Sequence, residues 1–180
     1  PRGRALIDER LWLPEEWTNS PARCDEAGVP EEESVYRTKW QLALEELRVS
    51  KQLGYLTAQW VVADDAYGES PGFRDGVAAE GWRYVVEVPS STPVWPEHTT
   101  WTTPPYSGFG RPPKARAVVA ERQQVRERAA ALPVETWQPV MVGEGAQGPR
   151  IYLFACERVR DSRDGKPGDV LWLVHRKNLD

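Results

Sequence analysis

The chain has 180 residues, of which 40% are hydrophobic and 10% aromatic, and this composition can fill the interior of one medium-sized domain. Its formal net charge of -4 excludes a protein whose whole surface attracts polyanions, so any nucleic-acid surface must be local. Cys24 and Cys156 lack the spacing of a zinc site or disulfide framework, and no apolar run approaches the roughly 18 residues of a membrane span. We therefore expect a cytoplasmic protein without a membrane segment and, because it starts at Pro1, a piece of a longer one.

The first 33 residues combine one strand pattern with an acidic stretch. An apolar pattern over 5–13 predicts a strand that stops at Pro14, because proline cannot donate to a sheet ladder. Residues 8–33 hold nine acidic residues against two basic ones, which is typical of a solvated face.

Two helices and two strands follow, in alternation. Apolar residues at helical spacing predict a helix that Gly54 closes, and Ser70, Pro71 and Gly81 are typical of the two ends of a second helix. The apolar run before Asp64 predicts a strand buried on both faces. The order strand, helix, strand, helix, strand predicts an α/β fold for residues 1–98, with the later elements at about 40–53, 59–63, 71–80 and 84–88.

Residues 99–180 have a different character and are predicted to form an insertion subdomain. Its first part is rich in Thr and Pro and reads as an irregular linker. A helix is predicted over 115–131, ended by Pro133, and a β-hairpin over 150–159 and 169–174 with its turn at 161–168.

The motif over residues 63–68 carries the most chemical information. Asp64 stands where a strand ends, and an acid held there can face a cleft and bind a hard divalent cation. We expect this strand to be central, flanked by the other two strands of the core. Strand alternation places Asp64 on one face with Trp60 and Val62, and Asp65 on the other. The alternative is that both acids only terminate the strand and cap the next turn. Tyr67 and Gly68 can likewise be explained by structural roles alone, as a packing aromatic and a turn glycine.

Several motifs in one order connect the chain to a known family. Together they resemble bacterial insertion-sequence transposases of the DDE class and, more narrowly, the seven-hundred-and-one branch of the insertion-sequence-four supergroup. The resemblance extends through nearly all of the chain and lies in residues 5–17, 23–31, 38–39, 63–68 and 84–89.

The resemblance implies a partial ribonuclease-H-like core with a β-rich insertion, and three acids that bind two Mg²⁺ or Mn²⁺ ions. Two bridged metals neutralise charge on the entering and leaving oxygens of a phosphodiester. Asp64 matches the second acid, whereas the context of Asp25 does not fit the first. The first and third acids are expected outside this chain, so the isolated chain is expected to be inert.

A basic stretch inside the acidic chain is the predicted DNA contact. Between residues 111 and 128, six basic residues stand against two acidic ones, and phosphate binding needs such clustering. A solvated helix face is the alternative. DNA ends and target DNA are the implied partners, a homo-oligomer of the intact parent stays open, and the predicted DNA-binding residues are Arg111, Lys114, Arg116, Arg122 and Arg126.

Two other functions compete with a metal-dependent transposase. One is a decayed, non-catalytic DNA-binding or assembly module that keeps the fold and the basic stretch. The other is an unrelated metal-dependent hydrolase, which would need further acids from this chain beside Asp64.

Overall fold

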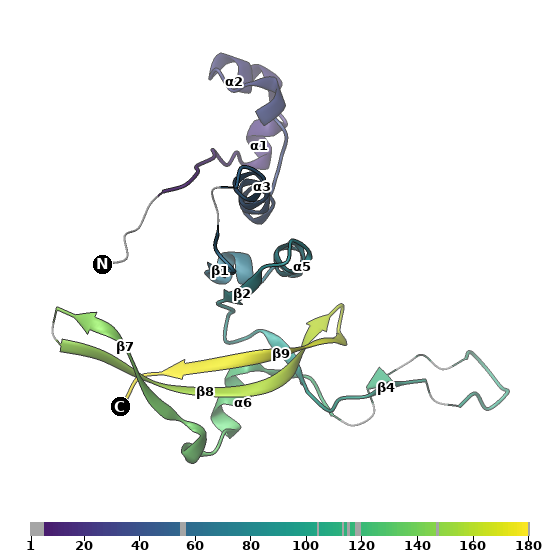
Figure 1. The fold of residues 1–180 in the computed structure, drawn as a ribbon. Coiled ribbons are helices and arrows are strands. Elements are labelled where there is room, and N and C mark those ends of the chain that lie inside the picture. The colour runs from purple at the N-terminus through teal and green to yellow at the C-terminus, as the bar shows by residue number, and fades with distance from the viewer. Residues whose placement is uncertain are drawn as a thin grey trace. The chain divides into compact units, whose positions relative to one another are not determined.

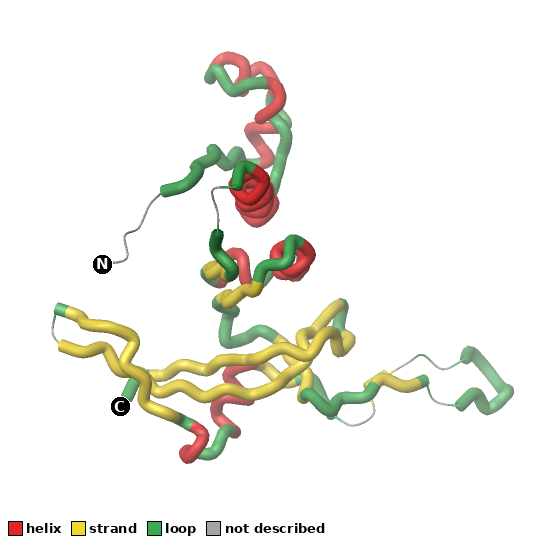
Figure 2. The backbone as a smooth tube through the Cα atoms, in the orientation of Figure 1, coloured by secondary structure: helices red, strands yellow, loops and turns green. Residues whose placement is uncertain are grey.

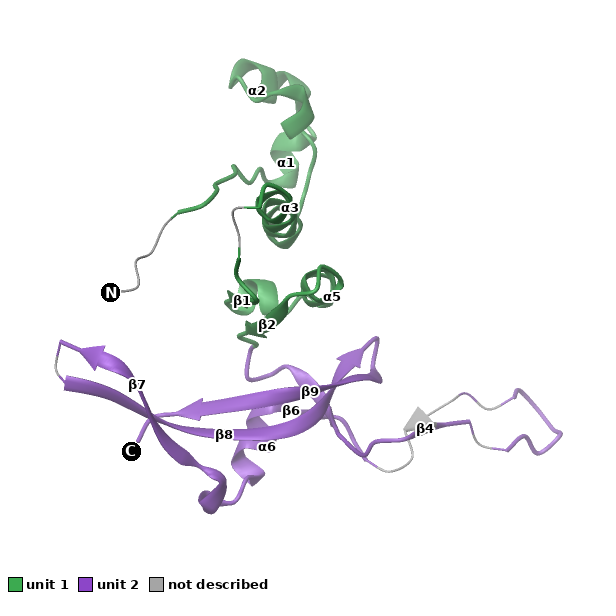
Figure 3. Ribbon diagram, viewed as in Figure 1, with its two compact units in different colours: residues 1–88 green, residues 89–180 purple. Residues whose placement is uncertain are grey.

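The computed structural model describes residues 6–54, 57–103, 105–112, 114, 116–117, 120–146 and 148–179. The chain divides into two compact units, Pro1–Val88 and Pro89–Asp180 (Figure 3). This division falls before the expected boundary at residue 98, because residues 93–96 form a strand that pairs within the second unit.

The predicted strand over 5–13 is wrong for the residues described, since 6–14 have no regular structure. Leu6, Ile7 and Leu11 are exposed, so their apolar pattern packs on no sheet. Side chains hold the segment instead: Arg10 forms ion pairs with Glu33 and Glu45. Eight of the nine acidic residues in 8–33 are exposed, as predicted, while Glu33 is half-buried and Cys24 is buried. The stretch includes the short helices α1 (Glu15–Thr18), α2 (Pro21–Glu26) and η1 (Glu31–Glu33).

The two predicted helices of the first unit are confirmed as α3 (Lys39–Gln52) and α5 (Pro71–Ala79). Thr38 begins α3 with a capping box, accepting a hydrogen bond from the backbone N–H of Gln41. The helices pack closely because glycines face α3: a Cβ built on Gly76 would lie 2.2 Å from Cδ2 of Leu44. The buried core of this unit consists of Leu44, Phe73, Val77 and Trp82.

The two predicted strands of the first unit are also confirmed, as β1 (Trp60–Ala63) and β2 (Arg83–Val86), which pair in parallel. The prediction that β1 is buried on both faces is wrong. Val61 and Ala63 pack on the core, whereas Trp60 is 49% and Val62 77% exposed. Among the described residues β1 pairs only with β2, so the expectation that Asp64 ends a central strand with two neighbours is wrong for this part of the chain.

The second unit is built on an antiparallel sheet of five strands with a long hairpin, β8 (Gly148–Arg163) and β9 (Lys166–Lys177) (Figures 1 and 2). The hairpin is confirmed, but its turn is shorter than predicted. Asp164 and Gly165 alone join the strands, both with positive φ (51° and 76°), as a two-residue primed turn requires. The edge of β8 not bound to β9 pairs with β7 (Gln138–Gly145) and β3 (Pro93–Pro96), and β3 also pairs with β6 (Gln123–Gln124).

The predicted helix over 115–131 is only partly confirmed, since α6 covers Val125–Ala131. Arg116–Ala117 form β5, which pairs with β4 (Trp101–Thr102), because strand pairing overrides the helical spacing there. The end is as predicted: Leu132 is extended before Pro133, and the 3-10 helix η2 (Val134–Thr136) follows. No helix in the described ranges is long and apolar enough to cross a membrane.

Candidate active site

Asp64 directly follows β1 and takes the N-cap position of the short helix α4 (Asp65–Gly68). Its backbone carbonyl accepts hydrogen bonds from the N–H groups of Tyr67 (3.2 Å) and Gly68 (2.9 Å). Its carboxylate is exposed and forms no cap bond to the helix. The backbone of Asp64 therefore serves the turn, while its carboxylate stays available to a ligand.

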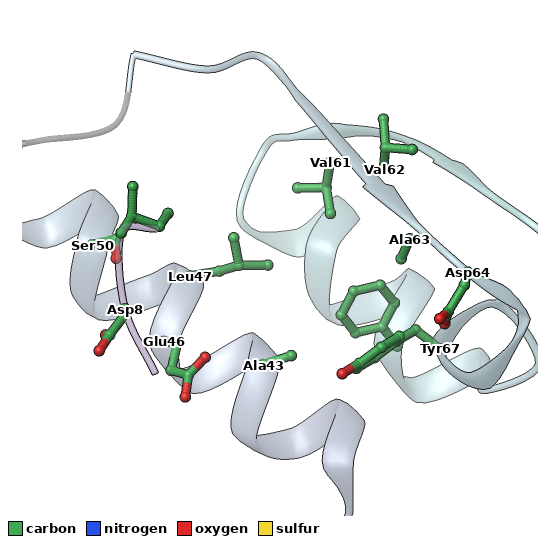
Figure 4. A pocket seen from close by; sticks show the side chains of 12 residues that line it. Asp8, Ala43, Glu46, Leu47, Ser50, Val61, Val62, Ala63, Asp64 and Tyr67 are labelled. Atoms are coloured by element: carbon green, nitrogen blue, oxygen red, sulfur yellow. The ribbon is translucent and has the colours of Figure 1, made fainter. Parts of the chain in front are cut away.

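A pocket of about 400 Å³ in the first unit includes Asp64 in its lining, whereas Asp65 is not part of it. Asp64 and Tyr67 lie at one end of the pocket and Asp8 and Glu46 at the other (Figure 4). Burial raises the pKa of the Glu46 carboxyl, and the charge of Asp8 adds to this effect. The apolar part of the lining comes mainly from α3, β1 and α5, namely Ala43, Leu47, Val61, Val62, Ala63 and Phe73.

These residues do not amount to a metal centre. Among the residues that the structure describes, no three His, Cys, Asp or Glu side chains come close enough together to hold an ion. Magnesium prefers six oxygen ligands and binds through one or two carboxylates with waters and phosphates, but catalysis with two metals needs several acids at one point. Asp64 alone does not fit that requirement, and its role as a ligand stays a prediction.

Tyr67 and Gly68 have packing roles in this motif. The ring of Tyr67 lies 5.4 Å from that of Phe73, measured between centroids, and packs on the core. Gly68 is buried against β2 and the residue after it: a Cβ there would lie 1.8 Å from the backbone oxygen of Glu87. Its carbonyl also accepts a hydrogen bond from the buried Arg74. Gly68 is thus a close-approach glycine, and not the positive-φ turn glycine considered as an alternative.

We expect Gly68→Ala to destabilise the first unit by about 1–3 kcal/mol, because its new methyl group meets backbone that cannot rotate away. Ala66→Gly, at an exposed position of the same helix, is the comparison and should cost no more than about 1 kcal/mol. Urea unfolding followed by circular dichroism measures both. Equal stability of Gly68→Ala and the unchanged chain would contradict this packing.

The predicted DNA-binding residues lie on different elements of the second unit. Arg111 and Lys114 are in exposed loops, Arg122 is exposed before β6, and Arg126 is exposed on α6. The side chain of Arg116, in β5, lies outside what the structure describes. The alternative of a solvated helix face therefore fits Arg126 but not Arg111, Lys114 and Arg122, which lie outside α6.

Arg128, from the same basic stretch, is turned inward to a half-buried charge cluster that no motif indicated. Its Nε lies 3.0 Å from both carboxylate oxygens of Glu157, and Nε2 of His175 lies 2.9 Å from Oε1 of Glu157. Every second side chain of β8 and β9 points to the same face, and the register makes Glu157 and His175 diagonal neighbours on the inner one. A correct prediction of this register would therefore have brought the two residues together. Burial alone would raise the pKa of Glu157, but its hydrogen bonds with Arg128 and His175 outweigh this and lower it.

Comparison with known families decides what kind of protein carries these features. The model of the family described as DDE superfamily endonuclease matches residues 2–149, which is most of the chain. The chain belongs to the DDE superfamily endonucleases. Neither the curated proteins nor the solved structures include a match to it.

Membership of this family bears on the predicted substrate, metal and fold. A DDE superfamily endonuclease acts on DNA and typically uses a divalent metal, as expected for this chain. The mixed α/β fold with an antiparallel sheet is consistent with a ribonuclease-H-like DDE domain. An unrelated hydrolase is no longer a competing function, because the family match extends from the first helices to β8.

Proposed function

We propose that the chain is part of the catalytic domain of a bacterial insertion-sequence transposase, of the seven-hundred-and-one branch of the insertion-sequence-four supergroup. Such an enzyme cleaves DNA at the ends of its element and joins them to target DNA, within the bacterial cytoplasm at the nucleoid. One observation carries the proposal: in a DDE superfamily endonuclease, Asp64 has a free carboxylate at the end of a strand and at the edge of a pocket.

In this proposal Asp64 is a ligand of Mg²⁺ or Mn²⁺, and the other acids come from residues that do not lie beside it here. When bound, the metals would supply charge neutralisation at the phosphodiester. The chain's own contribution is positional. The backbone hydrogen bonds from Tyr67 and Gly68 hold the Asp64 backbone, and Gly68 packs the turn against the carbonyl of Glu87.

The basic stretch supports a DNA contact in the second unit. Arg111, Lys114, Arg122 and Arg126 have exposed side chains, and the family acts on DNA. Lys and Arg that neutralise phosphates release counterions, so their contribution to binding falls steeply with salt. We propose that these four residues, together with Arg116, contact the DNA backbone.

A non-catalytic DNA-binding module remains the second candidate, because no acid cluster surrounds Asp64 in the described ranges. We expect the isolated 180-residue chain not to nick supercoiled plasmid at any Mg²⁺ or Mn²⁺ concentration, whichever candidate is right. Agarose gels of plasmid incubated with the chain measure this. Metal-dependent nicking that Asp64→Ala removes would contradict it, and would mean that one chain holds a complete site.

We also propose that residues 99–180 behave as a subdomain distinct from the core, joined through the Thr- and Pro-rich link. Limited proteolysis should then cut first between Pro96 and Pro113, where exposed loops surround the short strand β4. Mass spectrometry of the first fragments locates the cuts. Initial cleavage only near Val88, where the contacts divide the chain, would contradict the boundary at 98.

A further inference from the structure

One face of the β8–β9 hairpin is exposed although it is rich in arginine and aromatic side chains. Residues directly opposite each other in an antiparallel pair lie on the same face of the sheet. On this face the register joins Arg158 to Trp172, Cys156 to Val174 and Phe154 to Arg176. Trp172 is 66% and Val174 52% exposed, whereas Ala155, Val159 and His175 on the opposite face are buried. We call the alternating positions of this face, from Tyr152 to Arg160 on β8 and from Val170 to Arg176 on β9, the outer hairpin face.

The outer hairpin face is electropositive in a chain that is acidic on average. From Tyr152 to Arg160 on β8, and from Val170 to Arg176 on β9, its alternating positions hold three arginines and no carboxylate. Glu97 reaches this face from outside the hairpin, and its Oε1 lies 3.2 Å from Nε of Arg158. Arg160 serves the fold, since it donates to the backbone oxygens of Glu97 and Gly168.

The other two arginines lie over aromatic rings. The guanidinium carbon of Arg158 is 5.4 Å from the ring centroid of Trp172, and that of Arg176 is 5.2 Å from the ring centroid of Tyr152. A ring contacts the plane of a guanidinium and leaves the donors on its edge available, although Nε of Arg158 is already paired with Glu97. The exposed indole of Trp172 beside these donors is also a surface on which an unpaired base can stack.

We propose that the outer hairpin face binds single-stranded DNA, with Arg158 and Arg176 on phosphates and Trp172 stacked on a base. Charge complementarity favours this partner over an apolar protein surface, because the exposed Trp172 lies opposite Arg158 and Arg176 lies on the same face of β9. The proposal deepens the proposed function, since it rests on DNA being the substrate. It is independent of Asp64 and of any metal.

The test measures binding of the whole 180-residue chain in EDTA, by fluorescence anisotropy, to labelled oligothymidine and to the same strand in a duplex. We expect tighter binding to the single strand. Trp172→Ala should weaken it roughly 5- to 150-fold, which is the range for losing one stacked base, and Trp172→Phe should weaken it less. Arg158→Ala and Arg176→Ala should weaken it too and make its salt dependence less steep.

Arg83→Ala is the matched control, because Arg83 is exposed and lies 5.5 Å from the ring centroid of Trp60, an equivalent pair in the other unit. It should bind oligothymidine as the unchanged chain does. Thermal melts verify that each variant folds, as expected for a side chain as exposed as Trp172. Unchanged binding by Trp172→Ala and Arg158→Ala, an equal loss in Arg83→Ala, or self-association through this face without DNA binding would each overturn the proposal.

Discussion

Asp64→Asn in a parent protein that cleaves DNA is expected to reduce strand cleavage by about 1,000-fold or more, while leaving the melting temperature unchanged. The substitution keeps the size of the side chain and removes the charge with which we propose that it binds metal. Losing several kcal/mol of transition-state stabilisation corresponds to a rate loss of this order. The fold should tolerate the change, because the exposed carboxylate caps no backbone group and only the main chain of Asp64 serves the turn.

Asp65→Asn is the matched control, since it removes the same charge one residue later, at an exposed position outside the pocket lining. Asp65→Asn should cut DNA at close to the rate of the unsubstituted parent protein. Gel assays of end cleavage in Mg²⁺, together with thermal melts, measure both variants. If Asp64→Asn cuts normally, or if Asp65→Asn is the inactive variant, the assignment of Asp64 is wrong.

The local signals around Asp64 predicted the structure well. The apolar spacing that Gly54 closes, the Ser70–Pro71 helix start and the apolar run before Asp64 act over a few residues, and each element formed where they indicated. Local sequence can specify such elements because the helix caps, the turn and the strand end are all determined by near neighbours. The position of Asp64 at a strand end followed from these signals alone.

Strands and side-chain clusters that depend on residues far away in the sequence were predicted less well. Arg116 and Ala117 fit a helical pattern, yet they pair with β4, and the apolar residues 6–14 find no sheet in the described ranges. β7 gave no strand signal because Pro139 and two glycines interrupt it, and pairing with β8 stabilises it through a bulge after Met141. The Glu157 cluster was missed for the same reason, since its members are brought together by the register of β8 and β9.

Glu157→Gln should destabilise the second unit by about 1.5–3 kcal/mol and lower its melting temperature by roughly 6–20 °C. The side chains of Glu157 and His175 are only 11% and 3% exposed, and that of Arg128 is 19% exposed. Removing the carboxylate charge leaves the half-buried Arg128 guanidinium without its counter-charge. Glu144→Gln, at an exposed position of β7, is the control and should have little effect.

The same cluster should make the second unit sensitive to acid. Because the pKa of Glu157 is lowered from 4.5 in the folded chain, its ionised form contributes stability that is fully present above about pH 4.5. This contribution is lost as the pH falls through the folded pKa, where the unfolded chain already binds the proton. Thermal melts from pH 7 down to pH 3 should therefore show a steeper loss of stability for the unchanged chain than for Glu157→Gln. Parallel curves for the two proteins would mean that the carboxylate of Glu157 does not stabilise the folded unit through its charge.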